Sequence, residues 1–322
     1  MKLIAVLAGG FSHEKVVSVK SAATIIKYID KSKYTPVLVL VEKEKWTAEF
    51  ENSTYVVDKN DFSITVNSHK IKFEGAFNII HGTPGEDGLI SGYFDMLGIQ
   101  HTSNKALQGS LTFDKFLCNK LAKSFGAVTA NSFLLTSMND PQIASIEKEI
   151  GFPCFVKPND SGSSFGVTKV KQASELDAAI KHAFDNGTAV VVEAFVNGTE
   201  VACGIVKLKG KITVLPITEI VPDTEFFDFT AKYEGKSKEI TPARISEKAW
   251  KQVQHSTQLL YEKFMLRSFA RIDFIIQNDV PYLIEMNTIP GMSEASLVPQ
   301  QVREYGWTLE HFVTSVADEF FE

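Results

Sequence analysis

Apolar and polar stretches alternate along the first third of the chain in the order expected of strands and helices. The apolar run Lys2–Ala8 has the continuous character of a buried parallel strand. A glycine pair follows it, and a helix is then predicted from about Glu14 to Ile29, with Ser12 as its cap. Further strands are predicted at Tyr34–Leu40 and Gly75–Ile80. This alternation of strand, helix and strand indicates an open α/β domain.

The pattern changes in the middle of the chain. A helix is predicted at Asp114–Phe125, where Phe116, Leu117 and Leu121 recur at helical spacing. Beyond it the chain has an α+β pattern rather than a doubly wound one. The strands of this part are predicted at Cys154–Val156, Gly166–Val170 and Val190–Glu193, around one helix at Ser174–Phe184.

The last third joins long strands, a polar stretch and a hairpin. In chain order we expect strands at Val201–Lys207 and Ile212–Ile220, a polar stretch at Pro222–Pro242, a helix at Glu247–Phe264, a hairpin at Arg267–Glu285, a loop rich in glycine and proline, and a terminal helix. The length of 322 residues suggests two or three domains. The limits that we expect are 1–103 for an N-terminal α/β domain, 104–190 for a central subdomain and 191–322 for a C-terminal domain.

Composition narrows the class of protein. Of the 322 residues, 44% are hydrophobic and 22% are charged, an ordinary balance for a globular protein. The formal net charge is −6 with no basic tail, which argues against nucleic acid as the main partner. No apolar stretch reaches the roughly 18 residues that a membrane span needs, so no membrane insertion is expected. The N-terminal apolar run is interpreted as a first strand rather than a signal peptide.

The cysteines do not form a recognisable site. Cys118, Cys154 and Cys203 are far apart and have no CxxC spacing, so neither a zinc site nor a disulfide framework is indicated. Buried free thiols are expected, which fits a protein of the reducing cytoplasm.

The segment from Lys157 to Gly166, KPNDSGSSFG, has the composition of an anion-binding loop. Small residues let the backbone approach an anion, and successive N–H groups can hold phosphate oxygens. No Lys-Ser/Thr pair follows the last glycine, so the segment is not a Walker A loop. It could also be a plain hairpin loop. Lys157 ends an apolar strand and its charge needs a partner. Lys115 could play the same part from another domain, or could be a solvated helix lysine.

The segment from Val190 to Val196, followed by Glu200, could form an adenine site. Such a site needs apolar walls, backbone donors and acceptors for the base, and a carboxylate for the ribose hydroxyls. The segment contains all three kinds of group. The alternative is an edge strand with surface glutamates.

A hairpin near the C-terminus brings carboxylates together. Side chains two apart on a strand share a face, and a three-residue turn at Asn278–Val280 would set Asp273 opposite Glu285 and Arg271 opposite Asn287. Two carboxylates and an amide favour a hard cation, and the implied nucleotide makes it magnesium. The alternative to a metal site is that these charged side chains pair with one another in a purely structural role.

The segment that follows the hairpin could receive an anion close to the metal. Gly291 follows a proline and permits a tight turn. The backbone N–H groups and Ser296 could then receive a carboxylate.

Taken in order, these motifs resemble the D-alanine–D-alanine ligase family of the ATP-grasp superfamily. The resemblance covers nearly the whole chain, and the ordered set is highly specific. It is carried by Gly9-Gly10-Phe11-Ser12, the run HGTPGEDG at 81–88, Asp114-Lys115, 157–166, Glu193 with Glu200, Ala231-Lys232-Tyr233, Arg271-Ile272-Asp273 and the run EMNTIPG at 285–291.

The resemblance implies a three-domain ATP-grasp fold with α/β and α+β domains, in which ATP lies between the central and C-terminal domains. Its phosphates would meet Lys115, Lys157 and Lys232. The residues implied around the rest of the nucleotide are Ser163, Ser164, Glu193, Ala194, Phe195, Val196, Glu200 and Asn287. Two Mg²⁺ or Mn²⁺ ions would be held by Asp273, Glu285 and Asn287.

The resemblance also implies the reaction, which supplies peptidoglycan precursors. The carboxylate of one D-alanine would attack the γ-phosphate, and the amine of a second would attack the resulting acyl phosphate. Arg271 and the Gly291 N–H would stabilise the oxyanion, while Ser163 and Tyr233 would help to close the site. The substrates would be held by Glu14, Ser18, His81, Ser296 and Leu297. The family is commonly dimeric, and we expect a homodimer.

The chain departs from the family pattern at the first substrate's ammonium group. Members often carry Glu two residues before the Ser of the first helix, and here that residue is Val16, before Ser18. We expect Glu14 to replace it, although Glu14 could be merely a favourable acid at a helix N-terminus. Loop aromatics that are often Tyr are Phe226, Phe227 and Phe229.

Three other functions compete with this one. Another ATP-grasp carboxylate–amine or depsipeptide ligase is one rival, but Tyr233 favours the dipeptide. A non-catalytic nucleotide-binding protein is a second, but no metal ligand or phosphate lysine is missing. A dehydrogenase is disfavoured because no GxGxxG follows the first strand.

Overall fold

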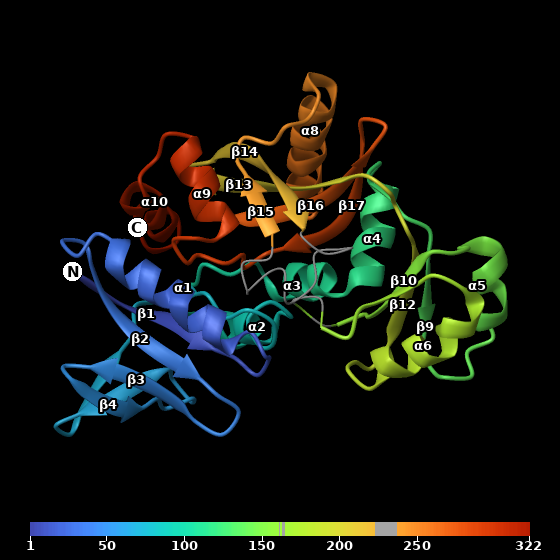
Figure 1. Ribbon diagram of the computed structural model, residues 1–322. Helices are drawn as coiled ribbons and strands as arrows, with labels where there is room; N and C mark the ends of the chain where they lie inside the picture. Colours follow the sequence, from blue (N-terminus) through green and yellow to red (C-terminus); the bar gives the residue numbers. More distant parts are fainter. Residues whose placement is uncertain (161, 163–164, 223–236) are drawn as a thin grey trace.

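The computed structural model describes residues 1–160, 162, 165–222 and 237–322. Its first sheet has the strand order β4-β3-β2-β1-β7, and β1 is parallel to both β2 and β7. A hairpin of β5 and β6 and the helices α1 and α2 complete this part, shown in blue and cyan in Figure 1. The bounds are β1 Lys2–Gly9, α1 Lys15–Tyr28, β2 Tyr34–Val41, β3 Trp46–Phe50, β4 Ser53–Val56, β5 Ser63–Val66, β6 His69–Lys72, β7 Gly75–Asn78 and α2 Leu89–Leu97.

Strand β1 is apolar throughout because both of its faces are buried. Ile4, Val6 and Ala8 pack in a core that includes α1 and the C-terminal helix. Ala5 and Leu7 pack in a second core on the other side, with residues of β2 and β5. The predicted buried parallel strand and open α/β domain are therefore confirmed.

The second sheet is antiparallel, with strand order β11-β10-β12-β9. Its core is formed with the apolar faces of α5 and α6. Strand β9 and helix α5 were not predicted from the sequence. The bounds in this part of the chain are α3 Ala106–Phe113, α4 Lys115–Ser124, β9 Ser132–Leu135, α5 Ile143–Glu149, β10 Cys154–Pro158, β11 Thr168–Val170, a 3₁₀ turn Ala173–Glu175, α6 Leu176–Phe184 and β12 Val190–Ala194.

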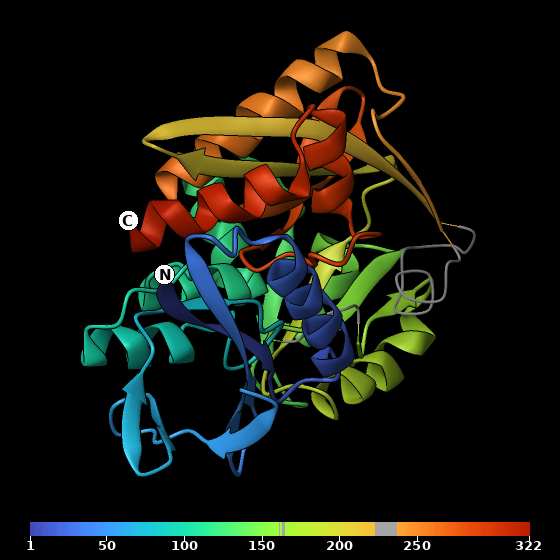
Figure 2. The same cartoon turned by 90° about the vertical axis from the view of Figure 1, so that its left-hand side faces the viewer.

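The third sheet has the order β15-β14-β13-β16-β17-β8. Helix α10 packs with the end of β13 on one side and with α1 on the other, so it joins the C-terminal part to the N-terminal part (Figure 2). The bounds are β8 Val128–Thr129, β13 Thr199–Leu208, β14 Lys211–Pro222, β15 Ser237–Ile240, α8 Glu247–Lys263, β16 Ala270–Gln277, β17 Val280–Asn287, α9 Leu297–Glu304 and α10 Leu309–Phe321. The limits predicted for the three domains remain predictions.

The hairpin of β16 and β17 has the predicted register, but for a different reason. Its turn has two residues, Asn278 and Asp279, and both have positive φ, at 53° and 66°. The expected three-residue turn is therefore wrong. An irregularity after Asp273 shifts the pairing by one residue, and this shift sets Asp273 opposite Glu285.

Helix α1 begins differently from the prediction. Its N-cap position is Glu14, and no side chain caps it. Ser12 instead accepts a hydrogen bond from the Glu14 N–H at 3.3 Å and donates one to the carbonyl of His81 at 3.1 Å. The prediction of Ser12 as a cap is therefore wrong, because its hydroxyl bridges two loops.

The three cysteines lie as the sequence predicted. Cys118, Cys154 and Cys203 are free and buried. Within the described ranges, no helix is both long and apolar enough to cross a membrane.

Candidate functional site

A cavity of about 400 Å³ lies between the second and third sheets. Strands β10 and β12 supply part of its wall through Phe155, Lys157 and Glu193, and β17 contributes from the third sheet. The residues predicted for a nucleotide that line this cavity are Lys115, Lys157, Glu193, Ala194, Phe195, Val196 and Glu200. The structure therefore brings these seven residues together.

Lys157 and Glu193 form a buried ion pair in this cavity. The Lys157 Nζ lies 2.8 Å from the Glu193 Oε2, and the side chains are 10% and 11% exposed. The contact lacks the alignment of a hydrogen bond. The two residues are on adjacent strands, since Phe155 pairs with Glu193 and Lys157 with Val191. A buried lysine charge needs such a partner, and an anionic ligand would supply a second one.

Aromatic side chains form apolar surface next to the pair. The rings of Phe155 and Phe195 are 5.9 Å apart, and the Lys169 Nζ lies 4.3 Å from the centre of the Phe195 ring. Glu200 lines the cavity and is the first residue of β13 that pairs with β14, opposite Ile220. This combination of apolar walls, cations and a carboxylate has the character of a nucleotide site.

The hairpin of β16 and β17 places carboxylates at the boundary of the cavity. Arg271 donates to Asp273 through Nε at 2.8 Å and through Nη2 at 2.7 Å. Asn287 Nδ2 donates to the same carboxylate at 3.0 Å. Asp273 and Glu285 are cross-strand partners, as are Arg271 and Asn287. The structure therefore brings together the four side chains that sequence analysis set opposite one another.

These donors suit a hard cation. Asp273 and Glu285 offer carboxylate oxygens from facing positions, and Asn287 offers an amide oxygen. No group of three or more His, Cys, Asp or Glu suitable for a metal occurs among the residues that the structure describes. The hairpin set does not conflict with that finding, because its third member is an amide.

A second cavity of about 320 Å³ adjoins the first, and Glu285 lines both. It lies among the first helix, the loop that begins at His81, the hairpin and the turn before α9. The residues predicted for substrate or oxyanion binding that line it are Glu14, His81, Arg271, Gly291, Ser296 and Leu297. Gly291 lies against Ser296, because a Cβ on this glycine would be 2.9 Å from the Ser296 Oγ.

His81 is a neutral, fixed group in the wall of the second cavity. Its Nδ1 lies 2.7 Å from the carbonyl oxygen of Ile289, and its Nε2 lies 3.3 Å from the Ser21 Oγ. Burial lowers the pKa of His81, although the negative charge of Glu14 opposes the shift. The ring is therefore a neutral hydrogen-bonding group near neutral pH.

Two carboxylates lie beside His81, and one of them was missed. Glu86 accepts a hydrogen bond from the Gly82 N–H at 2.7 Å, and burial raises its pKa, with a further contribution from Glu14. Glu14 reaches the glycine-rich loop, because a Cβ on Gly162 would lie 2.4 Å from its Oε2. Glu86 is part of the run HGTPGEDG at 81–88, but nothing in that pattern distinguished it from the neighbouring Asp87.

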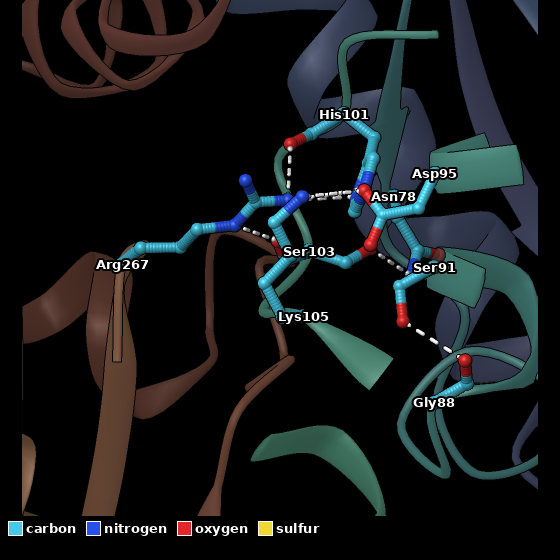
Figure 3. A network of polar contacts seen from close by, with 8 residues as sticks. All are labelled: Asn78, Gly88, Ser91, Asp95, His101, Ser103, Lys105 and Arg267. Carbon is cyan, nitrogen blue, oxygen red and sulfur yellow. Dashed lines mark hydrogen bonds and ion pairs between the residues drawn. The ribbon is translucent and has the colours of Figure 1, made fainter. Parts of the chain in front are cut away.

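A polar network anchors the loop that carries His81 (Figure 3). Arg267 of the C-terminal part donates through Nε to the Ser103 carbonyl at 2.8 Å and contacts the ring of His101 at 3.0 Å. Asn78 donates to the Ser103 Oγ at 2.8 Å and to the Gly85 carbonyl at 3.1 Å. The network therefore connects the segment just before β16 to the loop that begins at His81.

Some predicted residues are not brought to either cavity. Ser18 is fully buried, where it accepts from the Gly9 N–H at 3.1 Å and donates to the Ile79 carbonyl at 2.8 Å. It therefore ties α1 to the sheet and does not line the second cavity. Several predicted residues lie outside the described ones, namely Ser163, Ser164, Lys232 and Tyr233, together with Ala231, Phe226, Phe227 and Phe229.

Glu239 is a further acid of the second cavity that was not predicted from the sequence. It lies on β15, a strand within the stretch that was predicted only as polar. Its partner Gln300 lies sixty-one residues further along, so no local pattern could relate the two.

Comparison with known proteins identifies the family. The model described as "D-ala D-ala ligase N-terminus" matches residues 3–104, and that described as "D-ala D-ala ligase C-terminus" matches residues 121–318. A D-alanine–D-alanine ligase of Flavobacterium johnsoniae is 45% identical over 319 residues, covering 99% of each chain. One of Porphyromonas gingivalis is 43% identical over 317 residues, covering 98% of this chain and 96% of its own.

Solved structures agree with the sequence relatives. The VanG D-Ala:D-Ser ligase of Enterococcus faecalis superimposes with a TM-score of 0.88 at 29% identity, covering 99% of each chain. The D-alanine–D-alanine ligase of Bacillus anthracis complexed with ATP gives 0.78 at 27% identity, covering 99% of this chain and 96% of its own. The expected ATP-grasp fold is thereby confirmed, and the chain belongs to the D-alanine–D-alanine ligase family.

Proposed function

We propose that this protein joins two D-alanine molecules to form D-alanyl-D-alanine, with release of ADP and phosphate, as a step in peptidoglycan precursor synthesis. The observation that carries the proposal is the pair of adjoining cavities that share Glu285. One cavity has the character of a nucleotide site, and the other has the charges needed for amino acids. Family membership and the relatives named D-alanine–D-alanine ligase support the choice of substrate.

The first cavity is proposed to bind ATP. Its base would lie against Phe195 and Val196, beside Glu193, and its ribose hydroxyls would meet Glu200. Lys115 and Lys157 would neutralise phosphate charge, helped by Lys232, Ser163 and Ser164. Support comes from the Bacillus anthracis relative, which was solved with ATP.

The hairpin is proposed to hold two Mg²⁺ or Mn²⁺ ions through Asp273, Glu285 and Asn287. Bound there, the ions would reduce the negative charge of the triphosphate. The chain itself supplies the oxygen ligands and orients them by the cross-strand pairing of β16 and β17.

The second cavity is proposed to bind both amino acids. The first carboxylate oxygen would form a bond to the γ-phosphorus as the bond to ADP breaks. The ammonium of the second would first give one proton to water. Its neutral amine would then attack the acyl carbon, the bond from that carbon to phosphate would break, and the departing phosphate would take the second proton from the nitrogen. Arg271 and the Gly291 N–H would stabilise the oxyanion, with Ser163 and Tyr233 helping to close the site. Glu14 and His81 would hold the first substrate, and Ser296 and Leu297 the second carboxylate.

A different second substrate is the alternative function. The VanG relative is named as a D-Ala:D-Ser ligase, and its structure superimposes on this one over 99% of each chain. A ligase using another amino acid, or a hydroxy acid, therefore shares the fold. The residues around Ser296, together with Tyr233, would decide between these substrates.

The active protein is proposed to be a cytoplasmic homodimer. Leu89 and Met96 are seven residues apart on α2 and are 64% and 83% exposed, and Leu107 on α3 is 62% exposed. Exposed apolar side chains of this size are candidates for burial against a second copy. The buried free cysteines fit a reducing compartment.

The test is product identification. Purified protein would be incubated with ATP, magnesium and D-alanine, and the products separated by mass spectrometry. Equal amounts of dipeptide, ADP and phosphate are expected. ADP formation without a dipeptide would contradict the proposal, as would a protein that binds ATP and never turns it over.

A further inference from the structure

Glu239 is an acidic residue of the second cavity that neither the motifs nor the proposed mechanism uses. It lies on β15, where it pairs with Ile220 of β14, and it lines the cavity together with Arg271, Ser296 and Leu297. Its position on an edge strand brings a carboxylate to the C-terminal wall of the cavity. Glu14 and Glu86 lie on the N-terminal wall.

The carboxylate of Glu239 is held beside the start of α9. Gln300 Nε2 donates to the Glu239 Oε2, and the same nitrogen donates to the Ala295 carbonyl at 2.8 Å. Because the Glu239 carboxylate and the Ala295 carbonyl accept from the same nitrogen, Glu239 lies next to the turn that ends at Ser296. Gln300 is itself on α9, so its position relative to the helix start is fixed.

This carboxylate needs a cation. Within the described part of the chain its Oε1 accepts no hydrogen bond, and Gln300 is a neutral donor. Burial raises the pKa of Glu239, although the charge of Arg271 opposes this shift. Arg271 directs two hydrogen bonds to Asp273. A positively charged ligand group in the cavity would therefore be a favourable partner for Glu239.

An α-amino acid would present such a group at this place. Its carboxylate would be favoured at the N-terminus of α9, beside Ser296 and Leu297, where unpaired N–H groups and the helix dipole attract an anion. Its ammonium group is separated from that carboxylate by a single carbon. It therefore must lie near the α9 turn, beside which Gln300 holds the Glu239 carboxylate. The other acid on this wall, Glu285, lies on the hairpin and is assigned to the metal.

We propose that Glu239 binds the ammonium group of the second amino acid and thereby favours an amine over a hydroxyl nucleophile. The inference rests on the proposed function, because it presumes that two amino acids occupy this cavity. A hydroxy acid of the same size offers no positive charge, so it gains nothing from Glu239.

The test separates the two amino-acid sites. Initial rates over a range of D-alanine concentrations, with saturating ATP and magnesium, give one KM for each site. Glu239→Gln keeps the shape and removes the charge. It should raise the KM of the second site about 10- to 100-fold, as expected for a charged hydrogen bond. The first site and ATP should be unchanged, and the ratio of depsipeptide to dipeptide formed from D-lactate and D-alanine should rise.

A matched control comes from the same strand. Lys238 is exposed, so Lys238→Gln should behave as the unmodified protein. Glu239→Asp retains the charge and should recover part of the affinity at the second site. An unchanged second KM in Glu239→Gln would overturn the inference. Equal impairment of both amino-acid sites, or of Glu239→Asp and Glu239→Gln alike, would overturn it too, because it would show a structural role.

The same assay distinguishes failure of the inference from failure of the proposed function. If the unmodified protein forms no dipeptide from ATP and D-alanine, the proposed function itself fails, and the Glu239 inference fails with it. If the unmodified protein forms the dipeptide and Glu239→Gln has the same second KM, only the role of Glu239 is wrong.

Discussion

Arg271 and Asp273 form a two-point ion pair, with Nε 2.8 Å from Oδ1 and Nη2 2.7 Å from Oδ2. The two residues carry different proposed roles, one at the oxyanion and the other at the metal. Their pairing therefore links the two parts of the site. A cation at Asp273 would compete with the Arg271 guanidinium for the same oxygens, since Asn287 also donates to Oδ2. We therefore expect catalytic turnover to fall sharply when a charged side chain of this hairpin is replaced by a neutral one.

Asp273→Asn and Glu285→Gln should each nearly abolish turnover while the fold is retained. Each change keeps the shape of the side chain and removes a charged metal ligand. Turnover at increasing magnesium and the circular dichroism spectrum provide the measurement. Asp279→Asn, in the turn of the same hairpin, is the control and should keep its activity. Near-normal rates at saturating magnesium in the first two variants would refute the metal assignment.

Glu14→Gln should weaken the first D-alanine site by about 1.5–3 kcal/mol, with ATP affinity little changed. Glu14 lines the second cavity and makes no capping hydrogen bond to α1, so a role in helix capping is disfavoured. Val16, by contrast, is 64% exposed and does not line the cavity. Binding of each substrate can be measured by calorimetry and two-site kinetics. Glu44→Gln, an exposed acid away from the cavity, is the control. Wild-type affinity at both amino-acid sites would show that another group holds the ammonium.

Tyr233→Phe should loosen the selection between an amine and a hydroxyl nucleophile. The phenol is proposed to orient the second substrate, and its removal leaves the apolar bulk of the side chain. Competition between D-alanine and D-lactate at several pH values reports the product ratio. The same ratio in both proteins would mean that Tyr233 does not select the nucleophile.

His101 should make the protein less stable to unfolding at mildly acidic pH. Burial, and then the charge of Arg267, lowers the pKa of His101 from 6.5 to about 4. The His101 ring is therefore protonated below about pH 6.5 in the unfolded chain, but only below about pH 4 in the folded protein. The free energy of unfolding should fall in that window, by about 2 kcal/mol between about pH 7.5 and about pH 5.

Denaturant unfolding of His101→Gln at the two pH values checks this contribution. The variant should lose that part of the pH dependence, whatever its absolute stability. His69→Gln changes an exposed histidine and should leave the dependence as it is. Equal slopes for the unmodified protein and His101→Gln would contradict the assignment.

The local sequence predicted much of the site because its chemistry lies on regular elements. Strand alternation placed Asp273 opposite Glu285, and the structure agrees. The turn length was wrong, however, because the irregularity after Asp273 depends on how the two strands pair and is not visible in either alone. The anion-binding role expected of the segment after Lys157 stays a prediction, since residues 161, 163 and 164 lie outside the described ones.

Contacts between distant segments could not be predicted in this way. Ser12 looked like a cap because its type and position suited one, yet its hydroxyl donates to the His81 carbonyl sixty-nine residues away. Ser18 was expected from the family pattern, but it is buried and its hydroxyl bonds to Gly9 of β1 and to Ile79, just after β7. Glu239 had no local signal, because its environment is made by α9.

The most direct test of the central claim is the rate of phosphate release with ATP, magnesium and a panel of D- and L-amino acids. Rapid release is expected with D-alanine alone, little with L-alanine, and one dipeptide for each phosphate. Release that is equal for the two enantiomers, or that occurs without any amino acid, would contradict it.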